Sequence, residues 1–472
     1  MNYDLICIGG GIANLALAYT YKKENIQKTV AIIEKGNKIA NRICPKTKTG
    51  YCLNCKPCRI TTGFGGAGCF SDCKLTYSEE VGGSLINYVG KEKFNELQNS
   101  ARNFFSDLGA STPSYFNEKY FERFSKQCED SSLHLVKSEV QHLGTEGSYE
   151  LMLELYARLE QMGVDIICNT AVTEIDFKRH NIFVNNEVGL TNHYHYEKVS
   201  IAVGRYGSEW LSNICKKNGI ELEENTVDIG VRVEVPKYVL EPVASNLYEM
   251  KIVNQISDHS SVRTFCVNPG GFVVQENYDE VQCVNGHSFF NTKSDNSNFA
   301  LLYSIRFTEP FNDPIEYGKS ICKLANMLGG GHILVQRLGD LINNKRTNSK
   351  RLAENKVVPT LKDAIGGDLR FVLPSKAVDA IIDTLRKLDK VIPEIWDSDT
   401  LIYAPEVKFY SSKIKLNDKL QVKNKGMEDV YFLGDSSGVT HGIIQSCMSG
   451  IYTAENISKS NGKEEGYPFD IK

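Results

Sequence analysis

A glycine-rich turn between an apolar run and a helix-like stretch constrains the fold of this chain more than any other feature. Residues 3–8 are mostly apolar and end at three consecutive glycines, Gly9–Gly11, and residues 12–19 continue with the composition of a helix. A second apolar run, residues 30–33, ends on Glu34. Strand, glycine turn, helix and strand in this order predict a βαβ unit with two parallel strands.

The turn has the spacing of a dinucleotide site. Gly9 permits the tight turn, Gly11 lets the backbone approach a pyrophosphate, and the helix start directs unpaired N–H groups at the phosphates. Glu34 and the adjacent Lys35 end the second strand, where an acidic side chain accepts hydrogen bonds from ribose hydroxyls. Asn14 stands where a small residue usually lets helix and strand pack closely, so we expect a local shift there. These five residues are the predicted nucleotide contacts near the N-terminus.

A second motif, near the other end of the chain, indicates which dinucleotide is bound. Residues 430–433 look like a buried strand that leads into Gly434 and Asp435, and a helix-like run begins at Gly442 and Ile443. This order resembles the second FAD motif of flavoproteins of the glutathione-reductase class. The resemblance implies that Asp435 holds a ribityl hydroxyl and that the backbone of Gly442 and Ile443 lies near the flavin. A helix start there would stabilise negative charge on the reduced flavin.

Two positions in the middle of the chain fit the same class. Val172 falls where the class places a backbone contact to adenine, and Gly204 ends a segment that resembles the Ala-Thr-Gly strand end of the class. The four motifs follow one another in the order of that class, so FAD is the predicted cofactor.

Further motifs resemble a broad, poorly characterised family of bacterial and archaeal FAD-dependent dehydrogenases with a four-cysteine motif near the N-terminus. The similar segments run in the family's order between Tyr3 and about Ile457, at 63–68, 144–146, 230–234, 268–271, 285–288 and 366–369. The sequence departs from the family at 436–437, at 440–441 and at Lys408, where the family tends to carry Arg. The resemblance implies flavin redox chemistry and leaves the substrate open.

The order of elements and the resemblance together predict an α/β fold, in which a Rossmann-like FAD-binding domain of the glutathione-reductase class carries an inserted mixed β-sheet substrate domain. The expected boundaries are 1–79, 145–215 and 401–457 for the discontinuous FAD-binding domain, 40–75 for its cysteine-rich loop, 80–144 for a helical excursion, 216–400 for the substrate or cap domain and 458–472 for a flexible tail.

Fourteen cysteines are unusual in a chain of 472 residues, and six of them lie between Cys44 and Cys73. Four thiols, from Cys44, Cys52, Cys55 and Cys58, are enough for a tetrahedral sulfur site. The serial spacing resembles the ligand run of a 4Fe–4S ferredoxin, whereas structural zinc more often uses two separated pairs. A cluster would give the flavin a one-electron route, and zinc would only fix a long loop. Iron–sulfur, zinc and free thiols stay open.

Three further groups are candidates for chemistry. His441 is the only one of nine histidines inside a flavin motif, and it is the candidate catalytic residue, as a general acid. The alternative is a residue at a helix start that contacts flavin or solvent. Cys69 and Cys73 are either a redox dithiol or small buried hydrophobic residues. Glu406 and Lys408 either face the active-site cleft or form a structural pair.

The overall charge excludes some partners. The formal net charge is −4, so no basic field favours nucleic acid or an anionic membrane. No apolar run approaches 18 residues, and the first residues have no export pattern, so we expect a cytoplasmic protein without a membrane partner. Because no second Gly-x-Gly-x-x-Gly unit occurs, NAD(P)H is expected only as a transient electron donor, with a ferredoxin as the other candidate.

The expected activity is that of an FAD-dependent oxidoreductase that acts on a small organic substrate by hydride transfer at flavin N5. An iron–sulfur centre in the cysteine loop is a possible electron relay for this reaction. The alternatives are a flavin-dependent monooxygenase and a tRNA-modifying flavoprotein, and the balanced charge argues against the second of these.

Overall fold

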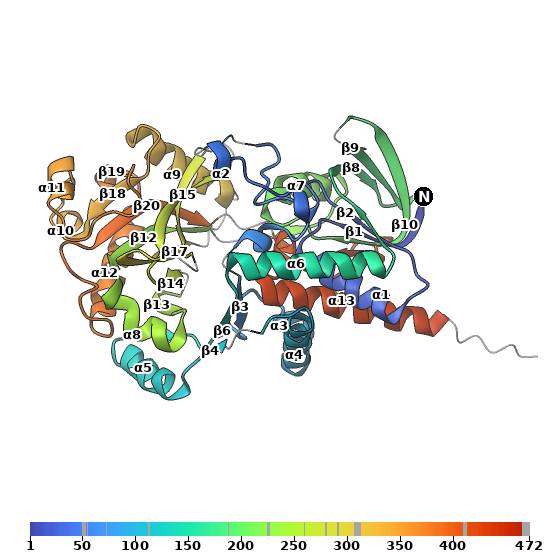
Figure 1. The fold of residues 1–472 in the computed structure, drawn as a ribbon, viewed down its shortest axis with the longest axis horizontal. Helices are drawn as coiled ribbons and strands as arrows, with labels where there is room; N and C mark the ends of the chain where they lie inside the picture. Colours follow the sequence, from blue (N-terminus) through green and yellow to red (C-terminus); the bar gives the residue numbers. More distant parts are fainter. Residues whose placement is uncertain are drawn as a thin grey trace, which may run out of the picture. The chain divides into compact units, whose positions relative to one another are not determined.

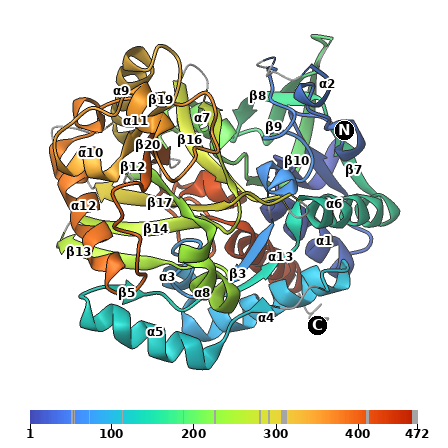
Figure 2. The same cartoon turned by 60° about the vertical axis from the view of Figure 1, so that its left-hand side comes forward.

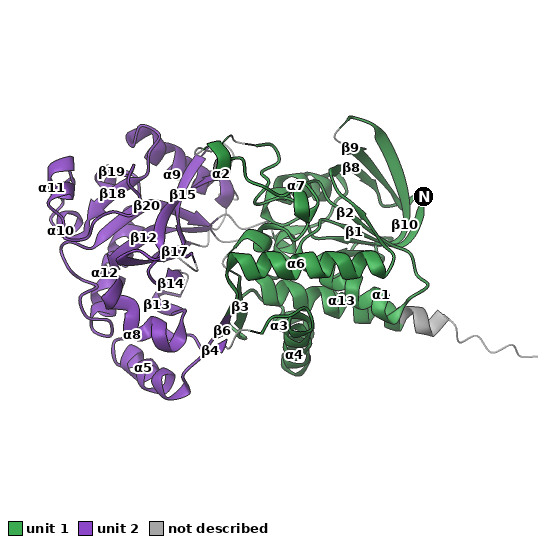
Figure 3. Cartoon of the chain, in the orientation of Figure 1, with its two compact units in different colours: residues 1–113, 142–223, 411–472 green, residues 114–141, 224–410 purple. Residues whose placement is uncertain are grey.

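The computed structural model (Figure 1) describes residues 1–464 except 50–52, 54, 72, 112–113, 187, 224–226, 259, 279–280, 290–291, 306–312 and 409–412. The chain forms two compact units (Figure 3), and each is discontinuous in sequence. Unit 1 comprises residues 1–113, 142–223 and 411–472, and unit 2 comprises residues 114–141 and 224–410.

Unit 1 is built on a sheet with the strand order β7-β2-β1-β10-β9-β8, in which β22 also pairs with β10. Its parallel part consists of β7 (Val164–Ile167), β2 (Val30–Ile33), β1 (Asn2–Ile8), β10 (Thr191–Ile201) and β22 (Val430–Phe432). Two antiparallel strands, β9 (Asn181–Asn186) and β8 (Thr170–Asp176), continue from β10. The predicted βαβ unit therefore forms the centre of this sheet.

Helices cover this sheet. α1 (Ile12–Glu24) starts directly after the glycine turn and lies beside α6 (Gly144–Gln161) and α13 (Ile443–Glu464) (Figure 1). The approach of α13 to α1 is so close that a Cβ on Gly450 would lie 2.0 Å from the carbonyl oxygen of Ala13. The other elements of unit 1 are η1 (Ile39–Asn41), α2 (Lys46–Thr49), η2 (Ala67–Phe70), β3 (Lys74–Tyr77), α3 (Ile86–Val89), α4 (Lys91–Asp107), η3 (Arg205–Gly207), α7 (Ser208–Lys217), β11 (Leu222–Glu223), β21 (Lys413–Ile414) and η5 (Asp435–Ser437).

Unit 2 contains a mixed sheet with the strand order β19-β18-β20-β12-β17-β14-β13-β5. Its long central strands, β12 (Val227–Pro236), β17 (Asn296–Ile305) and β14 (Ser260–Asn268), lie side by side in Figure 2. The other strands of this sheet are β5 (His134–Leu135), β13 (Ile252–Ser257), β18 (Leu334–Arg337), β19 (Ile365–Gly366) and β20 (Leu401–Lys408). β18 and β19 are parallel and the other pairs are antiparallel.

A separate hairpin in unit 2 pairs β15 (Phe272–Tyr278) with β16 (Val281–His287). α8 (Lys237–Leu247), α9 (Pro314–Leu328) and α12 (Ser375–Asp389) contact the strands of the mixed sheet and share its hydrophobic core. The remaining elements are β4 (Ser114–Tyr115), α5 (Glu118–Asp130), β6 (Glu139–His142), α10 (Leu338–Ile342), α11 (Ser349–Ala353) and η4 (Leu369–Phe371). Among the residues that the structure describes, no helix combines the length and the apolar character needed to cross a membrane.

The predicted fold class is confirmed, since a Rossmann-like parallel sheet and an inserted mixed β-sheet unit are both present. The boundaries differ from the expected ones in three places. Residues 80–144 do not form a body of their own, because α4 belongs to unit 1 and α5 to unit 2. Residues 401–408 belong to unit 2, because β20 pairs with β12 and β18. The tail expected from residue 458 is helical as far as Glu464.

Candidate functional site

The glycine turn after β1 has the geometry that the sequence predicts. Gly9 has a φ of +97°, and a Cβ at this position would lie 2.4 Å from the carbonyl oxygen of Ala202 at the end of β10. Gly11 is the N-cap of α1 and places no side-chain hydrogen-bond acceptor at the start of the helix. The N–H groups of the first helical turn are thus left for another acceptor, as in an anion site.

Asn14 has a structural role that differs from the expected local shift. Its fully buried side chain donates from Nδ2 to the carbonyl oxygens of Ile8 (2.8 Å) and Gly9 (2.9 Å). The Ser200 hydroxyl donates to Asn14 Oδ1 over 2.7 Å. The amide therefore joins α1 to β1 and β10, where a small residue would only allow close packing. No pattern in the sequence singled out Ser200.

Glu34 is buried at the end of β2, with its carboxylate fixed by backbone donors. Oε2 accepts from the N–H of Gly10 (2.6 Å) and Oε1 from the N–H of Gly36 (2.7 Å). A carboxylate has about four lone-pair positions, so its oxygens retain acceptor capacity for ribose hydroxyls. The neighbouring Lys35 side chain is exposed. Thr170 donates its N–H to the carbonyl oxygen of Glu34 over 3.0 Å, which places the start of β8 beside the end of β2.

Val172 and Gly204 lie on two other strands of unit 1. Val172 is partly buried on β8, next to an irregularity in the β8–β9 register. Gly204 follows β10 with a φ of +62°, and a Cβ there would meet no atom within 4 Å. Backbone conformation, and not crowding, therefore favours glycine at residue 204.

Asp435 lies between two cationic partners just after β22. Arg205 Nε donates to Asp435 Oδ2 over 2.5 Å, and His441 Nδ1 lies 2.6 Å from Asp435 Oδ1. Burial opposes ionisation, but the charges of Arg205 and His441 hold the pKa of Asp435 well below its ordinary value. Arg205 was missed at the sequence level. β10 and β22 are parallel neighbours, so the residues that follow the two strands meet at one edge of the sheet. The position of Arg205 directly after a predicted strand was therefore the signal that could have placed it near Asp435.

The segment from Gly434 to Ile443 carries the rest of the predicted flavin motif. Gly434 and Gly442 have φ values of +64° and +74°, and a Cβ at Gly442 would meet no atom within 4 Å. Ile443 is the first residue of α13. Within the described residues, the buried hydroxyl of Thr440 has no hydrogen-bond partner. An unpaired buried hydroxyl beside open backbone is consistent with a ligand group at this position.

The four predicted metal ligands cannot all be placed, because Cys52 lies outside the described residues. Cys44, Cys55 and Cys58 are partly buried. No three His, Cys, Asp or Glu side chains in the described part of the chain are grouped to hold a metal ion. The four-thiolate site stays a prediction.

The buried Arg42 organises the cysteine-rich loop through backbone carbonyl groups. Its guanidinium donates to the carbonyl oxygens of Arg59 (3.1 Å), Phe64 (2.7 Å) and Gly66 (2.8 Å). Cys69 and Cys73 are both buried, and burial raises the pKa of Cys69 to about 11 although Arg42 opposes the shift. A protonated, buried thiol favours the interpretation of Cys69 as a small hydrophobic residue.

Unit 2 contains a second charged cluster, which is sealed from solvent. Arg232 donates from Nε and Nη2 to the two carboxylate oxygens of Glu406, over 2.8 and 2.6 Å, and Lys408 Nζ lies 3.0 Å from Glu406. Burial opposes ionisation of Glu406, but Arg232 and Lys408 lower its pKa below the ordinary value. Glu406 and Lys408, which the sequence left as either cleft residues or a structural pair, thus share a salt bridge inside the unit.

Three of the sequence motifs meet around this arginine. Arg232 donates to Asn298 Oδ1 (2.9 Å) and Asn285 Oδ1 (3.2 Å), and Asn268 donates to the same oxygen of Asn298 over 3.3 Å. A Cβ on Gly286 would lie 2.2 Å from Arg232 Nη1, so only glycine fits there without rearrangement. The motifs at 230–234, 268–271 and 285–288 are therefore parts of one buried network.

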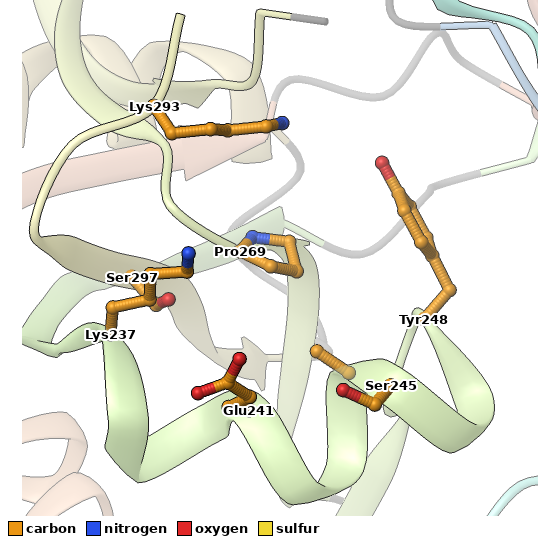
Figure 4. Close-up of a pocket in the computed structure, with 8 residues that line it drawn as sticks. Lys237, Glu241, Ser245, Tyr248, Pro269, Lys293 and Ser297 are labelled. Atoms are coloured by element: carbon orange, nitrogen blue, oxygen red, sulfur yellow. The ribbon is translucent and has the colours of Figure 1, made fainter.

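An open pocket of about 220 Å³ lies on unit 2 (Figure 4). α8 contributes Lys237, Glu241 and Ser245 to its wall, and Lys293 reaches into it from the loop before β17. Burial and the charge of Lys237 lower the pKa of Lys293. No ion pair to either lysine occurs in the described parts of the chain. The wall of the pocket therefore carries two lysines and one glutamate.

Part of the chain matches a known protein family. Residues 226–409 match the family model described as "FAD-dependent protein, C-terminal domain-like". No curated protein matches the sequence.

Solved structures with a similar course of the chain include L-proline dehydrogenase from P. horikoshii, with 12% identity, a TM-score of 0.42, and coverage of 97% of this chain and 94% of that chain. A flavoprotein/dehydrogenase from Cytophaga hutchinsonii has 11% identity, a TM-score of 0.40, and coverage of 99% and 80%. Glycine oxidase from Geobacillus kaustophilus has 11% identity, a TM-score of 0.38, and coverage of 99% and 96%.

Proposed function

We propose that this chain is an FAD-dependent oxidoreductase that acts on a small organic substrate. One arrangement in unit 1 carries the proposal. The parallel strands β1, β2, β10 and β22 end at a common edge, where the glycine turn, Glu34, Gly204 and Asp435 follow them. In open α/β sheets, dinucleotides bind at the carboxyl ends of the strands. The match of residues 226–409 to a domain of FAD-dependent proteins supports the same cofactor.

The residues at this edge fit FAD in chemistry and in space. The turn at Gly9 and Gly11 and the start of α1 would hold the pyrophosphate, and Glu34 would accept from the ribose of the adenosine half. Asp435 would accept from a ribityl hydroxyl, and the backbone near Gly442, where a Cβ would meet no atom within 4 Å, would lie near the flavin ring. When bound, the flavin supplies N5 as the hydride donor or acceptor.

His441 is the proposed general acid. Asp435 holds the imidazole through Nδ1, which fixes the orientation of the ring and provides a counter-charge for its protonated form. His441 would then deliver its proton from Nε2 to a substrate atom. The Arg205 guanidinium keeps Asp435 ionised, so that the carboxylate can orient the imidazole.

A Gly11→Ala substitution tests the FAD site with little risk to the fold. Gly11 has an ordinary backbone conformation, and a Cβ there would meet only the carbonyl oxygen of Ala202, at 3.9 Å. The new methyl would instead occupy the space through which the backbone approaches the pyrophosphate. We expect a folded protein with flavin occupancy reduced at least about tenfold, measured after denaturation by chromatography and mass spectrometry.

The matched control is Gly163→Ala, a glycine in a turn of unit 1 at which a Cβ would meet no atom within 4 Å. We expect this variant to keep its flavin, although the φ of +72° makes it somewhat less stable. Full FAD occupancy in folded Gly11→Ala protein would contradict the proposed site.

We further propose that Cys44, Cys52, Cys55 and Cys58 bind a 4Fe–4S cluster, with zinc as the alternative. Anaerobic purification followed by iron, zinc and acid-labile sulfide analysis distinguishes the two metals. Cys55→Ser should abolish metal binding, whereas Cys128→Ser, which changes a buried cysteine of unit 2, should leave the metal content unchanged. One zinc per chain with no iron would eliminate the electron-relay version.

The electron donor is proposed to be NAD(P)H or a reduced ferredoxin. Anaerobic bleaching of the flavin absorbance by NADH, NADPH and reduced ferredoxin, tested in parallel, identifies the donor. If none of the three bleaches the flavin, the chain is better described as a dehydrogenase that takes its electrons from the organic substrate.

A further inference from the structure

Two buried thiols in unit 2 lie close together, and the proposed flavin chemistry uses neither of them. Cys283 on β16 and Cys322 on α9 have their sulfur atoms 3.3 Å apart, and both residues are almost completely inaccessible to solvent. They are separated by 39 positions in the sequence. Both lie outside the cysteine-rich loop of residues 40–75.

A neighbouring pair of hydrogen bonds holds the two backbones in register. Asn326 Oδ1 accepts from the N–H of Gln282 over 2.8 Å, and Asn326 Nδ2 donates to the carbonyl oxygen of the same residue over 3.0 Å. Gln282 is adjacent to Cys283, and Asn326 lies one helical turn after Cys322. This clamp holds β16 and α9 together beside the two cysteines, and an S–S bond of about 2.05 Å requires the sulfur atoms to approach each other from 3.3 Å.

We propose that Cys283 and Cys322 form a reversible disulfide with a peroxide as the oxidant. The Cys283 thiolate attacks a peroxide oxygen, the O–O bond breaks, and a sulfenic acid and water are formed. The Cys322 sulfur then displaces the hydroxyl group as a second water, with loss of its proton. Two thiols thus give two electrons to one hydrogen peroxide molecule. A small-molecule dithiol reverses the step by thiol–disulfide exchange.

The surroundings make this oxidation slow and dependent on pH. The shared hydrogen bond with Cys322 and burial raise the pKa of Cys283, and nearby Glu276 adds to the shift, whereas the Lys408 ammonium opposes it. Since the thiolate is the reactive form, the rate of crosslinking rises with pH. Hydrogen peroxide is small enough to reach thiols that larger disulfide reagents do not.

The crosslink would stiffen the strand that contributes to the sealed cluster. Cys283 and Asn285 are two positions apart on β16 and therefore share one face of the hairpin. Asn285 accepts from Arg232 and donates to Glu276 Oε2 over 2.8 Å. A bond between β16 and α9 thus fixes the position from which Asn285 contacts Arg232.

Peptide mapping of the full-length protein tests the proposal without reference to flavin content. Folded protein is incubated with hydrogen peroxide, alkylated in denaturant and digested. We expect a linked peptide pair containing Cys283 and Cys322, loss of two alkylated cysteines, and reversal by dithiothreitol. The crosslink should raise the melting temperature of the full chain by roughly 5–10 °C.

Two variants complete the test. Cys322→Ala should remove both the linked peptides and the thermal shift, whereas Cys215→Ala, which alters a fully buried cysteine of unit 1, should preserve both. Complete alkylation of Cys283 and Cys322 after peroxide treatment would overturn the proposal. So would a linked pair that forms only when denaturant is present during the oxidation.

Discussion

The two units each hold an arginine, a carboxylate and a second cationic side chain, yet the two clusters differ in their access to solvent. In unit 1 the side chains of Arg205, Asp435 and His441 are 34%, 20% and 25% exposed. In unit 2 the side chains of Arg232 and Glu406 are fully buried and that of Lys408 is 6% exposed. Similar charges therefore occupy an open edge in one unit and a closed interior in the other.

Solvent access decides what each cluster can do. Breaking a buried ion pair leaves an uncompensated charge in a medium of low polarity, so the sealed cluster constrains the fold of unit 2 strongly. Partly exposed ion pairs contribute little to stability, because water screens them. The cluster in unit 1 is correspondingly available to a ligand, and its two cations act on the ionisation and orientation of Asp435.

The largest expected effect is on the stability of unit 2. Glu406→Gln leaves the buried Arg232 without its counter-ion, and we expect a loss of about 3–5 kcal/mol in the free energy of unfolding measured with urea. The double variant Arg232→Met/Glu406→Gln removes both charges and should recover part of this loss. A loss below about 1 kcal/mol in the single variant would show that the cluster is not sealed in solution.

A smaller effect on stability, but a large one on flavin binding, is expected in unit 1. Asp435→Asn should cost at most about 1 kcal/mol, since its partners remain hydrated, while flavin occupancy falls about tenfold or more. The matched control is Asp418→Asn, which changes an exposed acid of the same unit. Equal flavin content in the two variants would show that Asp435 does not contribute to flavin binding.

The acid sensitivity of unit 1 gives a third test. Since the pKa of Asp435 is depressed in the folded state, its contribution to stability is complete above the ordinary carboxyl pKa of 3.8 and is lost as the pH falls further. Arg205→Gln removes the largest cause of the depression and should raise the pKa of Asp435, a change that carboxyl NMR measures.

In the Arg205→Gln variant the contribution of Asp435 to stability is smaller, and its loss on acidification is complete at a higher pH. Arg158→Gln, which breaks an exposed pair with Glu154 on α6, should leave the titration of Asp435 unchanged. An identical Asp435 titration in both variants would show that the Arg205 contact does not persist in solution.

The smallest effect concerns the open pocket of unit 2, where Lys237 lowers the pKa of Lys293. Lys237→Gln should raise the pKa of Lys293 and slow its acylation by a succinimidyl ester about twofold, because less of the amine is neutral. Lys376→Gln, an exposed lysine of the same unit, serves as the control. The acylation rates are measured by peptide mass spectrometry. Equal rates for Lys293 with and without the Lys237→Gln substitution would show that the charge of Lys237 does not act on Lys293.

Local spacing was sufficient to predict the strand ends at which the candidate site lies. The turn at Gly9, the acid at Glu34 and the strand before Asp435 are set by patterns of a few residues, and the structure places all three at strand ends. Contacts between distant segments were not predictable in this way. Arg205 and Arg232 find their carboxylates 230 and 174 positions away in the sequence.

The predicted domain boundaries differ from the observed ones for a related reason. β20 has the apolar character of a strand from either sheet, and only its pairing with β12 and β18 assigns it to unit 2. His193 and His195 lie in a polar stretch of the sequence, yet they belong to β10, because the exposed end of this strand pairs with β9. Pairing partners are a property of the folded chain, and hydrophobic patterning alone does not specify them.

The contact between Gly450 and Ala13 also has a consequence for how the protein is made. α1 precedes residues 224–410 of unit 2 in the chain, but its packing partner α13 and the strand β22 follow them. Domains fold as units during synthesis. Unit 1 of the nascent chain therefore keeps the apolar surface of α1 uncovered until α13 has been translated. A ribosome that stalls between β20 and β22 would hold a chain in which unit 2 is complete and unit 1 is not.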